Sequence, residues 1–326
     1  MMTILRTIRH LIVGLAAFAA IATPLWFVIA AFGGKFGFWE PIDGFRHVLG
    51  LAGFNALNWF GLPGAIGRGF ILPLTAGLGL LALIVAIGFR LIFGQANAPG
   101  AGGYVAGVLA LVVGVAPLAL VTSASGDRAA IPPIHDITTD FETPPQFTGA
   151  LIERRGANAN SVDYHAKTDP RSQRPLPEVQ AEAYPDVAPL ITTAEPALAY
   201  RAAHATARDL GWRISTASEG AMMFEAQDVT FWFGFIDDVV VRVTPLDNGG
   251  SRVDARSVSR VGMSDLGANA ARLRTFFAAL ESSLGDGVAM APAPEPVSQP
   301  DPAPEAGDGA ADRLSPLARA GETRLP

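Results

Sequence analysis

The sequence predicts an α-helical membrane anchor of three transmembrane helices, followed by a two-layer α+β domain with an antiparallel sheet and two helices. The anchor is predicted because charged residues make up only 17% of the 326-residue chain and almost vanish from residues 1–123, whereas soluble domains carry about 25%. The α+β domain is predicted because helix-like and strand-like apolar periodicities both occur between residues 195 and 286.

Three apolar stretches of the anchor are long enough to cross a bilayer, which takes about 20 helical residues. They cover about residues 8–31, 70–93 and 104–121. The first also resembles a cleavable signal, because basic Arg6 and Arg9 precede an apolar run with a small-x-small ending. The apolar run continues past that ending to Phe32, so we expect an anchor that is not cleaved.

Basic residues beside the apolar stretches predict the orientation. Arg6, Arg9 and His10 precede the first stretch and Arg90 ends the second, so these ends are expected on the cytoplasmic side. Three spans then leave everything after residue 121 outside the cytoplasm. Arg68 lies on the other side of the second stretch and favours the opposite orientation.

The segment between the first two spans contains Trp39, Trp59 and several phenylalanines, a composition typical of the membrane interface. Residues 45–60 could form a helix on the outer membrane surface or a loop packed against the spans, and both alternatives stay open. After the third span, residues 124–133 are a polar, proline-bearing linker.

The soluble domain is expected over residues 134–286. Its first part, to about residue 196, is rich in proline and turn residues and predicts extended chain with one short strand at 149–156. A helix is predicted from Pro196 to a stop at Gly211. Five strand patterns follow, at 212–216, 221–227, 230–235, 238–246 and 251–260. The last two flank Asp-Asn-Gly-Gly, a strong hairpin signal.

A final helix is predicted to begin after Ser264 or Asp265, which are good N-caps, and to end at Gly285. Apolar residues recur at steps of three and four along it, which gives one buried face. Residues 287–326 are rich in proline, alanine and acids and lack aromatics. Such a segment buries too little apolar surface to fold, so we expect a disordered tail.

Three motifs carry a resemblance to a known family. They are IHDITTDFETPPQF at 134–147, AYPDVAPL at 183–190 and SRVGMSDLGANAARLRTFF at 259–277. In this order they resemble the bacterial and plastid family called domain of unknown function 1499, over about residues 134–285. The preceding spans look like the membrane-anchored bacterial version. The resemblance implies one compact domain on the periplasmic side of a multi-pass inner (plasma) membrane anchor, and it supplies no reaction.

One candidate ligand site is the junction between the last strand and the last helix. Arg256 and Arg260 lead up to a helix start, where free N–H groups favour an anion such as phosphate or carboxylate. The structural alternative is that Ser264 and Asp265 cap the helix while one of the arginines pairs with Asp265 or Asp254. We favour the structural alternative, because Asp265 occupies the place that an anion would take.

A second candidate is His135 with Asp136 and Asp140, a residue set suited to general acid–base catalysis or a metal site. Adjacent residues on an extended chain point to opposite faces, so His135 and Asp136 do not easily hold one ion. A structural role, in which these groups bond turns and backbone, is favoured. No catalytic residue is therefore assigned, and His135, Asp136 and Asp140 stay candidates only.

Composition excludes several functions. The chain has no cysteine, which rules out disulfides, thiolate metal sites and a cysteine nucleophile. A net charge of −6 without a basic patch argues against nucleic acid. No Walker loop, nucleophile elbow or zinc-ligand spacing occurs, and no cofactor or metal is expected.

The sequence favours a non-enzymatic module that binds an envelope component or partner protein, and the expected partners are the lipid bilayer and an envelope protein or a small anionic ligand. One alternative is an envelope hydrolase or metal-assisted enzyme that uses His135, Asp136 and Asp140. A second is a lipid-handling protein, in which segment 45–60 and the aromatic segment 230–235 form one apolar route.

Overall fold

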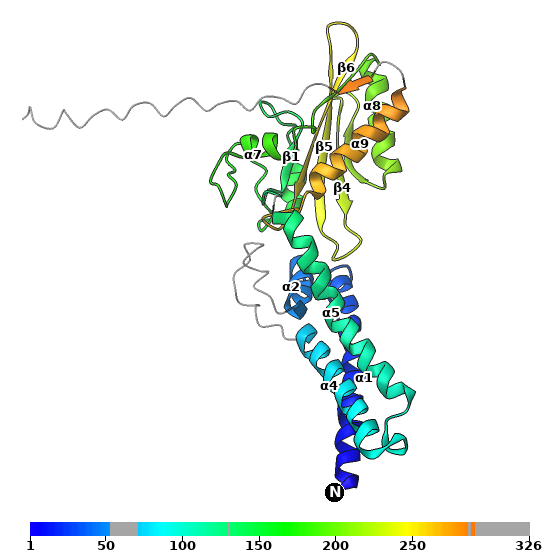
Figure 1. Ribbon diagram of the computed structural model, residues 1–326. Coiled ribbons are helices and arrows are strands. Elements are labelled where there is room, and N and C mark those ends of the chain that lie inside the picture. Colours follow the sequence, from blue (N-terminus) through cyan, green and yellow to red (C-terminus); the bar gives the residue numbers. More distant parts are fainter. Residues whose placement is uncertain (53–70, 130, 286–287, 291–326) are drawn as a thin grey trace, which may run out of the picture.

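The computed structural model describes residues 1–52, 71–129, 131–285 and 288–290. Helices form its amino-terminal part and an α+β domain, hereafter the head, forms the rest, with the amino terminus at the end far from the head (Figure 1). The tail predicted at 287–326 lies outside these residues apart from 288–290. Residues 53–60 of the expected interfacial segment also lie outside them.

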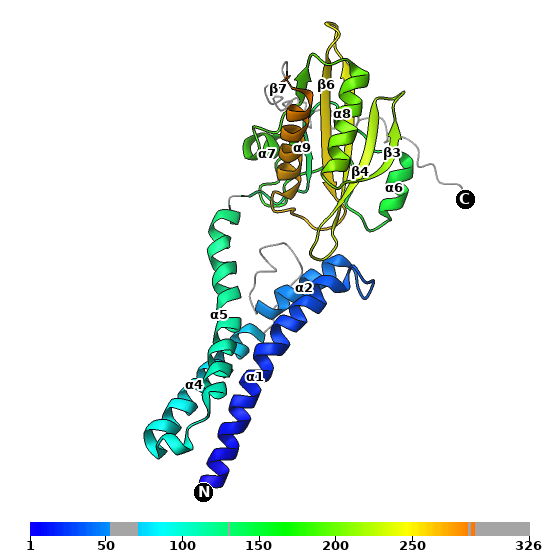
Figure 2. The same ribbon diagram turned by 90° about the vertical axis from the view of Figure 1, so that its right-hand side faces the viewer.

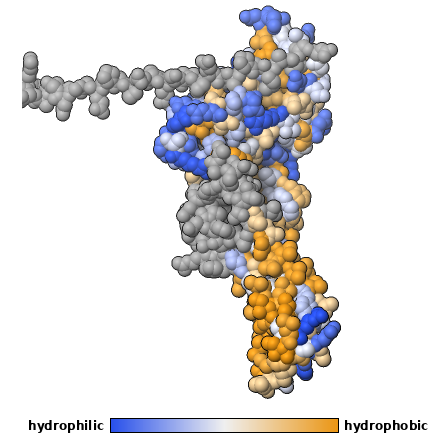
Figure 3. Space-filling view, in the orientation of Figure 1, coloured by the Kyte–Doolittle hydropathy of each residue, from blue (hydrophilic) through white to orange (hydrophobic). Residues whose placement is uncertain are grey.

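Three long helices, α1 (Met2–Gly33), α4 (Ile71–Phe93) and α5 (Ala101–Ala129), pack side by side. Two of them contain stretches long and apolar enough to cross a membrane, Met2–Gly33 and Leu72–Phe93, whereas the apolar part of α5, Ala101–Pro117, is shorter. Their outer surface is mostly hydrophobic (Figure 3). The helix α5 continues to Ala129, so residues 124–129 of the expected linker are helical.

Small residues let these helices approach closely, as in many membrane bundles. Ala16, Ala82 and Ala110 form a buried cluster between the three helices. A Cβ atom on Gly79 of α4 would lie 2.4 Å from the Leu111 nitrogen of α5, so this contact requires glycine. A 3-10 turn, η2 (Gln95–Asn97), connects α4 to α5.

The helix α2 (Pro41–Ala52) follows α1 and packs against it. The Trp39 indole N–H donates to the Ala30 carbonyl at 3.2 Å, which satisfies one of the free carbonyls at the end of α1. The described part of segment 45–60 is therefore helical, and this helix begins earlier than expected, at Pro41.

The head contains an antiparallel sheet with the strand order β3-β4-β5-β6. On its other edge, β6 pairs with both β1 and β2, and β7 pairs with β2. The strands are β1 (Asp136–Thr138), β2 (Leu190–Thr192), β3 (Arg213–Ser218), β4 (Met223–Val229), β5 (Ile236–Pro245), β6 (Ser251–Ser259) and β7 (Val288–Met290). The predicted hairpin around residues 247–250 is confirmed, because β5 and β6 pair from Pro245↔Ser251 to Asp237↔Ser259.

Two helices, α8 (Pro196–Asp209) and α9 (Ala268–Leu284), lie on one face of the sheet (Figure 2). Alanines 199, 203 and 207 of α8 are fully buried against the strand valines, since small side chains let a helix lie close to a sheet. On the opposite face, Phe147 and Leu151 pack on Val240 and Val258. The α+β architecture expected from the sequence is thus present.

Two strand predictions are wrong. Residues 149–156 hold a short helix, α6 (Gly149–Arg155), because the Thr148 hydroxyl accepts the Leu151 N–H as an N-cap and Gly156 ends it. With α7 (Leu176–Ala183), the described head has four helices instead of two. Residues 230–235 form the turn between β4 and β5, because Phe233 and Gly234 both adopt positive φ angles that a strand cannot accommodate.

Candidate functional site

Arg256 and Asp136, expected in two different sites, form one buried ion pair between β6 and β1. The Arg256 Nε and Nη2 atoms donate to the two Asp136 carboxylate oxygens at 2.9 and 2.8 Å, and the Lys167 ammonium donates to the second oxygen at 2.5 Å. Neither Arg256 nor Asp136 is exposed. The guanidinium is also covered by the rings of Phe147 and Tyr164. Both charges are therefore occupied by protein partners.

The Asp136 carboxylate stays charged in this setting. Burial would raise the pKa of Asp136, but hydrogen bonds and charge from Arg256, followed by Lys167, bring it below its usual range. An ionised carboxylate that already accepts three donors is a poor base, so the pair serves packing and specificity.

Asp140 closes a turn. Its Oδ1 accepts the N–H groups of Glu142 and Thr143 at 3.2 and 2.9 Å, and Arg242 donates to Oδ2 at 2.9 Å. Burial would raise the pKa of Asp140, but the Thr143 hydrogen bonds and nearby arginines lower it. Its contacts are those of a turn-stabilising aspartate.

The His135 side chain lines a separate cleft of about 310 Å³ together with Lys167, Asn160 and Gln173. Neither Asp136 nor Asp140 lines that cleft. Burial, and then the Lys167 ammonium, lower the pKa of His135 to about 4. Its ring is therefore neutral at pH 7 and is not assembled with the two carboxylates.

Arg260, which is partly buried, forms a second ion pair, with the buried Asp238 of β5. Its Nε and Nη2 atoms each donate to one carboxylate oxygen at 2.8 Å, and Arg155 of α6 donates to the same carboxylate at 2.5 Å. A bidentate pair of this kind is among the stronger side-chain interactions. Arg256 lies in β6 and Arg260 directly follows this strand, but the two arginines bind different carboxylates and do not form one anion site.

Ser264 and Asp265 organise the entry to α9. The Ser264 hydroxyl accepts the Leu266 N–H at 3.1 Å, and the Asp265 carboxylate accepts the N–H groups of Gly267 and Asn269 at 2.8 and 2.9 Å. The helix begins at Ala268. Burial raises the pKa of Asp265 to about 6, against the effect of its backbone hydrogen bonds.

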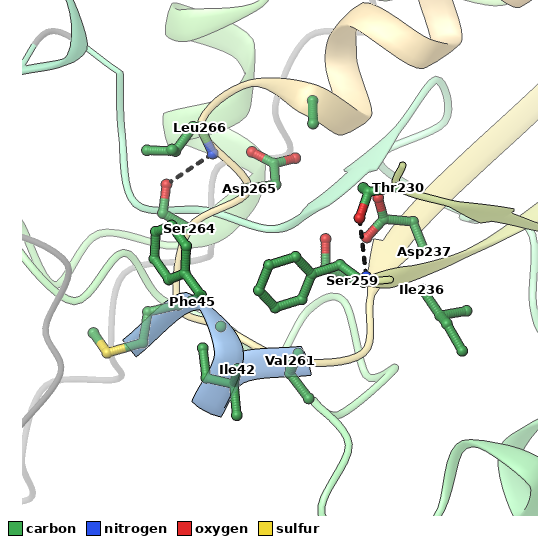
Figure 4. Close-up of a pocket in the computed structure, with 14 residues that line it drawn as sticks. Ile42, Phe45, Thr230, Ile236, Asp237, Ser259, Val261, Ser264, Asp265 and Leu266 are labelled. Atoms are coloured by element: carbon green, nitrogen blue, oxygen red, sulfur yellow. Dashed lines mark hydrogen bonds between the residues drawn. The ribbon is translucent and has the colours of Figure 1, made fainter. Parts of the chain in front are cut away.

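These two residues also line a pocket between the head and helix α2, hereafter the junction pocket (Figure 4). Its volume is about 160 Å³. Ile42 and Phe45 of α2 form one wall opposite Asp237 and Ser259. The other lining residues come from the β4–β5 turn and the loop before α9: Thr230, Phe235, Ile236, Val261, Gly262, Met263, Ser264, Asp265, Leu266 and Ala268.

The polar side of the junction pocket is held in place by α9. Arg272 donates to Asp237 at 2.6 Å and to Asp228 at 2.8 Å, and it also reaches Asn269. Asp237 is only 4% exposed. The pocket therefore has carboxylate acceptors on one side and apolar side chains on the other. This arrangement suits a molecule with both an apolar part and a hydrogen-bond donor.

Comparison with known proteins identifies the domain that forms the wall of the junction pocket opposite α2. A family model described as "Protein of unknown function (DUF1499)" matches residues 136–280, from β1 into α9. Residues 136–280 are a DUF1499 domain. No curated protein matches the chain. The match confirms the resemblance expected for the domain and assigns no activity.

Part of the junction pocket was expected from the sequence. Ser264 and Asp265 were candidates, and the lipid-handling alternative included Phe45 and segment 230–235, which supplies Thr230 and Phe235. Ser259 was interpreted as a strand position, and Asp237 was assigned to no element. The available signal was the pair Asp237 and Asp238, which follows the aromatic segment 230–235. Acids at the start of a strand are uncommon unless they form an ion pair or bind a ligand. Within the described residues, no group of three or more histidines and acids could hold a metal ion.

Proposed function

We propose that this protein is a membrane-anchored binding module that holds an amphiphilic envelope component in the junction pocket. The observation that carries the proposal is the composition of the pocket walls. One wall belongs to α2, which packs on the apolar helix α1, and the other belongs to the DUF1499 domain. A site shared between an anchor and a head is reached directly from the membrane surface.

The lining favours a ligand with a short apolar part and a donor group. Ile42, Phe45 and Val261 offer apolar contact, while the Asp237 carboxylate and the Ser259 hydroxyl offer acceptors. Asp265, with its pKa of about 6, is mostly ionised at neutral pH. A hydroxyl-bearing or amine-bearing lipid fits this chemistry better than an anionic one, because two carboxylates line the pocket.

The anchor in this proposal has three spans, with α5 as the third, and the head faces the periplasm across a bacterial inner membrane. The distribution of basic residues supports the orientation. Arg6 and Arg9 both bond Asn97 in the α4–α5 connection, and Arg90 lies in the last turn of α4, so all three gather at the end remote from the head. On the head side, the described residues include the cations Lys35 and Arg46.

An enzyme fused to the chain tests this orientation. Alkaline phosphatase placed after residue 287 folds only outside the cytoplasm, so we expect activity from this fusion in intact cells. A green fluorescent protein at the same position is expected to stay dark if exported in an unfolded state. Inactive phosphatase together with bright fluorescence would reverse the orientation.

Native mass spectrometry of the full chain released from detergent tests the ligand. We expect the purified protein to carry an adduct in the mass range of a lipid. Val261→Trp fills the pocket and should remove the adduct, whereas Ile152→Trp, on the exposed surface of α6 where Ile152 is 44% exposed, should retain it. An adduct that survives Val261→Trp, or no adduct on the unchanged protein, would overturn the proposal.

A further inference from the structure

The turn between β4 and β5, residues 230–235, is a preformed structure and not a loose loop. Thr230 N–H donates to the Phe235 carbonyl, and Phe235 N–H donates back to the Thr230 hydroxyl, both at 2.9 Å. The Thr230 hydroxyl in turn donates to the Trp232 carbonyl at 2.7 Å. Phe233 has a φ of 66°, which a bulky residue adopts only when its surroundings fix it.

Those surroundings are the last turns of α1. The Phe233 N–H donates to the Ala31 carbonyl at 2.9 Å, which occupies a second carbonyl at the end of that helix. A Cβ atom on Gly34 would lie 2.6 Å from the Phe233 carbonyl oxygen. The turn is thus fitted against α1, and it points toward the helical part in both views (Figures 1 and 2).

Aromatic rings from both parts of the chain meet at this level. Phe231 and Trp232 contact Phe32 at centroid distances of 5.5 and 5.3 Å, and Trp232 contacts Phe27 at 5.6 Å. The Lys35 ammonium lies 4.6 Å from the centre of the Phe231 ring. Aromatic side chains beside a lysine, at the end of an apolar helix, are typical of a membrane–water interface.

Much of this aromatic surface remains uncovered by protein. Phe231 is 65% exposed and Trp232 is 45% exposed, and Phe36 and Phe38, just beyond α1, are each 71% exposed. Exposed aromatic residues gathered from two distant segments indicate a surface that contacts something apolar. The surface is continuous with α1, which is itself long and apolar enough to cross a membrane.

We propose that the β4–β5 turn lies in the interfacial layer of the bilayer, where lipid headgroups and the first acyl carbons cover Phe231 and Trp232. The head would then be held against the membrane at two points, the α5 connection and this turn. The proposal rests on the anchoring stated above but not on a ligand in the junction pocket.

Depth measurement by electron paramagnetic resonance tests this proposal. Because the chain has no cysteine, a single Phe231→Cys change in the full-length protein gives one spin-label site at an already exposed position. The matched control is Asn248→Cys in the β5–β6 turn, at the opposite end of β5. Both proteins are reconstituted in vesicles of phosphatidylethanolamine and phosphatidylglycerol.

The label at position 231 should collide with oxygen more often, and with a water-soluble nickel chelate several-fold less often, than the label at position 248. Equal access of the nickel chelate to both positions would overturn the proposal. Loss of the lipid adduct in mass spectrometry would leave this result unchanged, so failure of the pocket ligand and failure of the membrane contact are distinguishable.

Discussion

Replacing Asp136 by asparagine should cost the head a large part of its stability. The side chain keeps its size but loses its charge, so Arg256, which is fully buried, is left without a counter-ion. Removing one partner of a buried pair costs about 3–5 kcal/mol, whereas whole domains are stable by about 5–15 kcal/mol. For a domain of this size the expected fall in Tm is roughly 6–20 °C.

A matched control exists on the surface. Asp186 accepts two hydrogen bonds from Arg274, at 2.5 and 2.7 Å, in the same bidentate manner, but the two side chains are 55% and 42% exposed. Exposed pairs contribute about 0–1 kcal/mol. Asp186→Asn should therefore leave the Tm within about 4 °C of the unchanged protein.

Intrinsic tryptophan fluorescence of the full chain in one detergent follows the unfolding of the head, because Trp212 is buried and stacked on Phe276 at 5.1 Å. The double change Asp136→Leu with Arg256→Met should recover most of the loss, since apolar replacement of a buried pair is often neutral. Equal effects of Asp136→Asn and Asp186→Asn would refute the argument from burial.

Two further predictions concern pH and one concerns helix packing. The pKa of His135 falls from 6.5 to about 4 on folding, so its contribution to the free energy of unfolding decreases as pH falls through this window, and His135→Gln should remove that pH dependence. The pKa of Asp265 rises from 3.8 to about 6, so its contribution is present below pH 3.8 and lost as pH rises through 6, and Asp265→Asn should remove it. Each change in the free energy of unfolding reaches about 3 kcal/mol and is measured by urea unfolding at pH 4 and 6.5. If the free energy of unfolding changed with pH in the same way in His135→Gln and Asp265→Asn, the assignment would be contradicted. Among the amino-terminal helices, Gly79→Val should lower the Tm because its Cβ meets the Leu111 nitrogen, whereas Gly88→Val, with nothing within 4 Å, should not. Equal shifts would exclude close packing as the cause.

The elements that the sequence predicted well are those with long periodic patterns. The helices from Pro196 and before Gly285, and the hairpin around residues 247–250, each combine many apolar positions with a clear stop or turn signal. The wrong predictions concern short segments. Residues 149–156 are too few for periodicity to separate helix from strand, and the N-cap at Thr148 was the decisive signal.

The turn at 230–235 was mistaken for a different reason. Its aromatic residues have strand propensity, but Phe233 is held at a positive φ by contact with Ala31, about two hundred positions earlier in the chain. No local pattern contains that contact. The same holds for the junction pocket, whose walls come from α2 and from the DUF1499 domain.

The candidate site residues illustrate what a sequence leaves undetermined about charge. Asp136 was a candidate catalytic residue and Arg256 a candidate ligand-binding residue, and they were assigned to separate sites because 120 positions separate them. An aspartate near a histidine suggests catalysis only while its partner is unknown. The structure shows that Arg256 is the partner of Asp136, and the pair is part of the core.

The two arginine–aspartate pairs also explain why the junction pocket is lined by acids and not by arginines. Arg256 and Arg260 are each consumed by a carboxylate, Asp136 and Asp238. Two acids are left facing the junction pocket. Asp237 accepts from Arg272, and Asp265 accepts the backbone N–H groups of Gly267 and Asn269 at the start of α9. Carboxylate oxygens accept up to about four hydrogen bonds, so these two retain acceptor capacity toward the pocket. A strand that presents arginines in its sequence thus leads, in three dimensions, to a pocket that accepts donors.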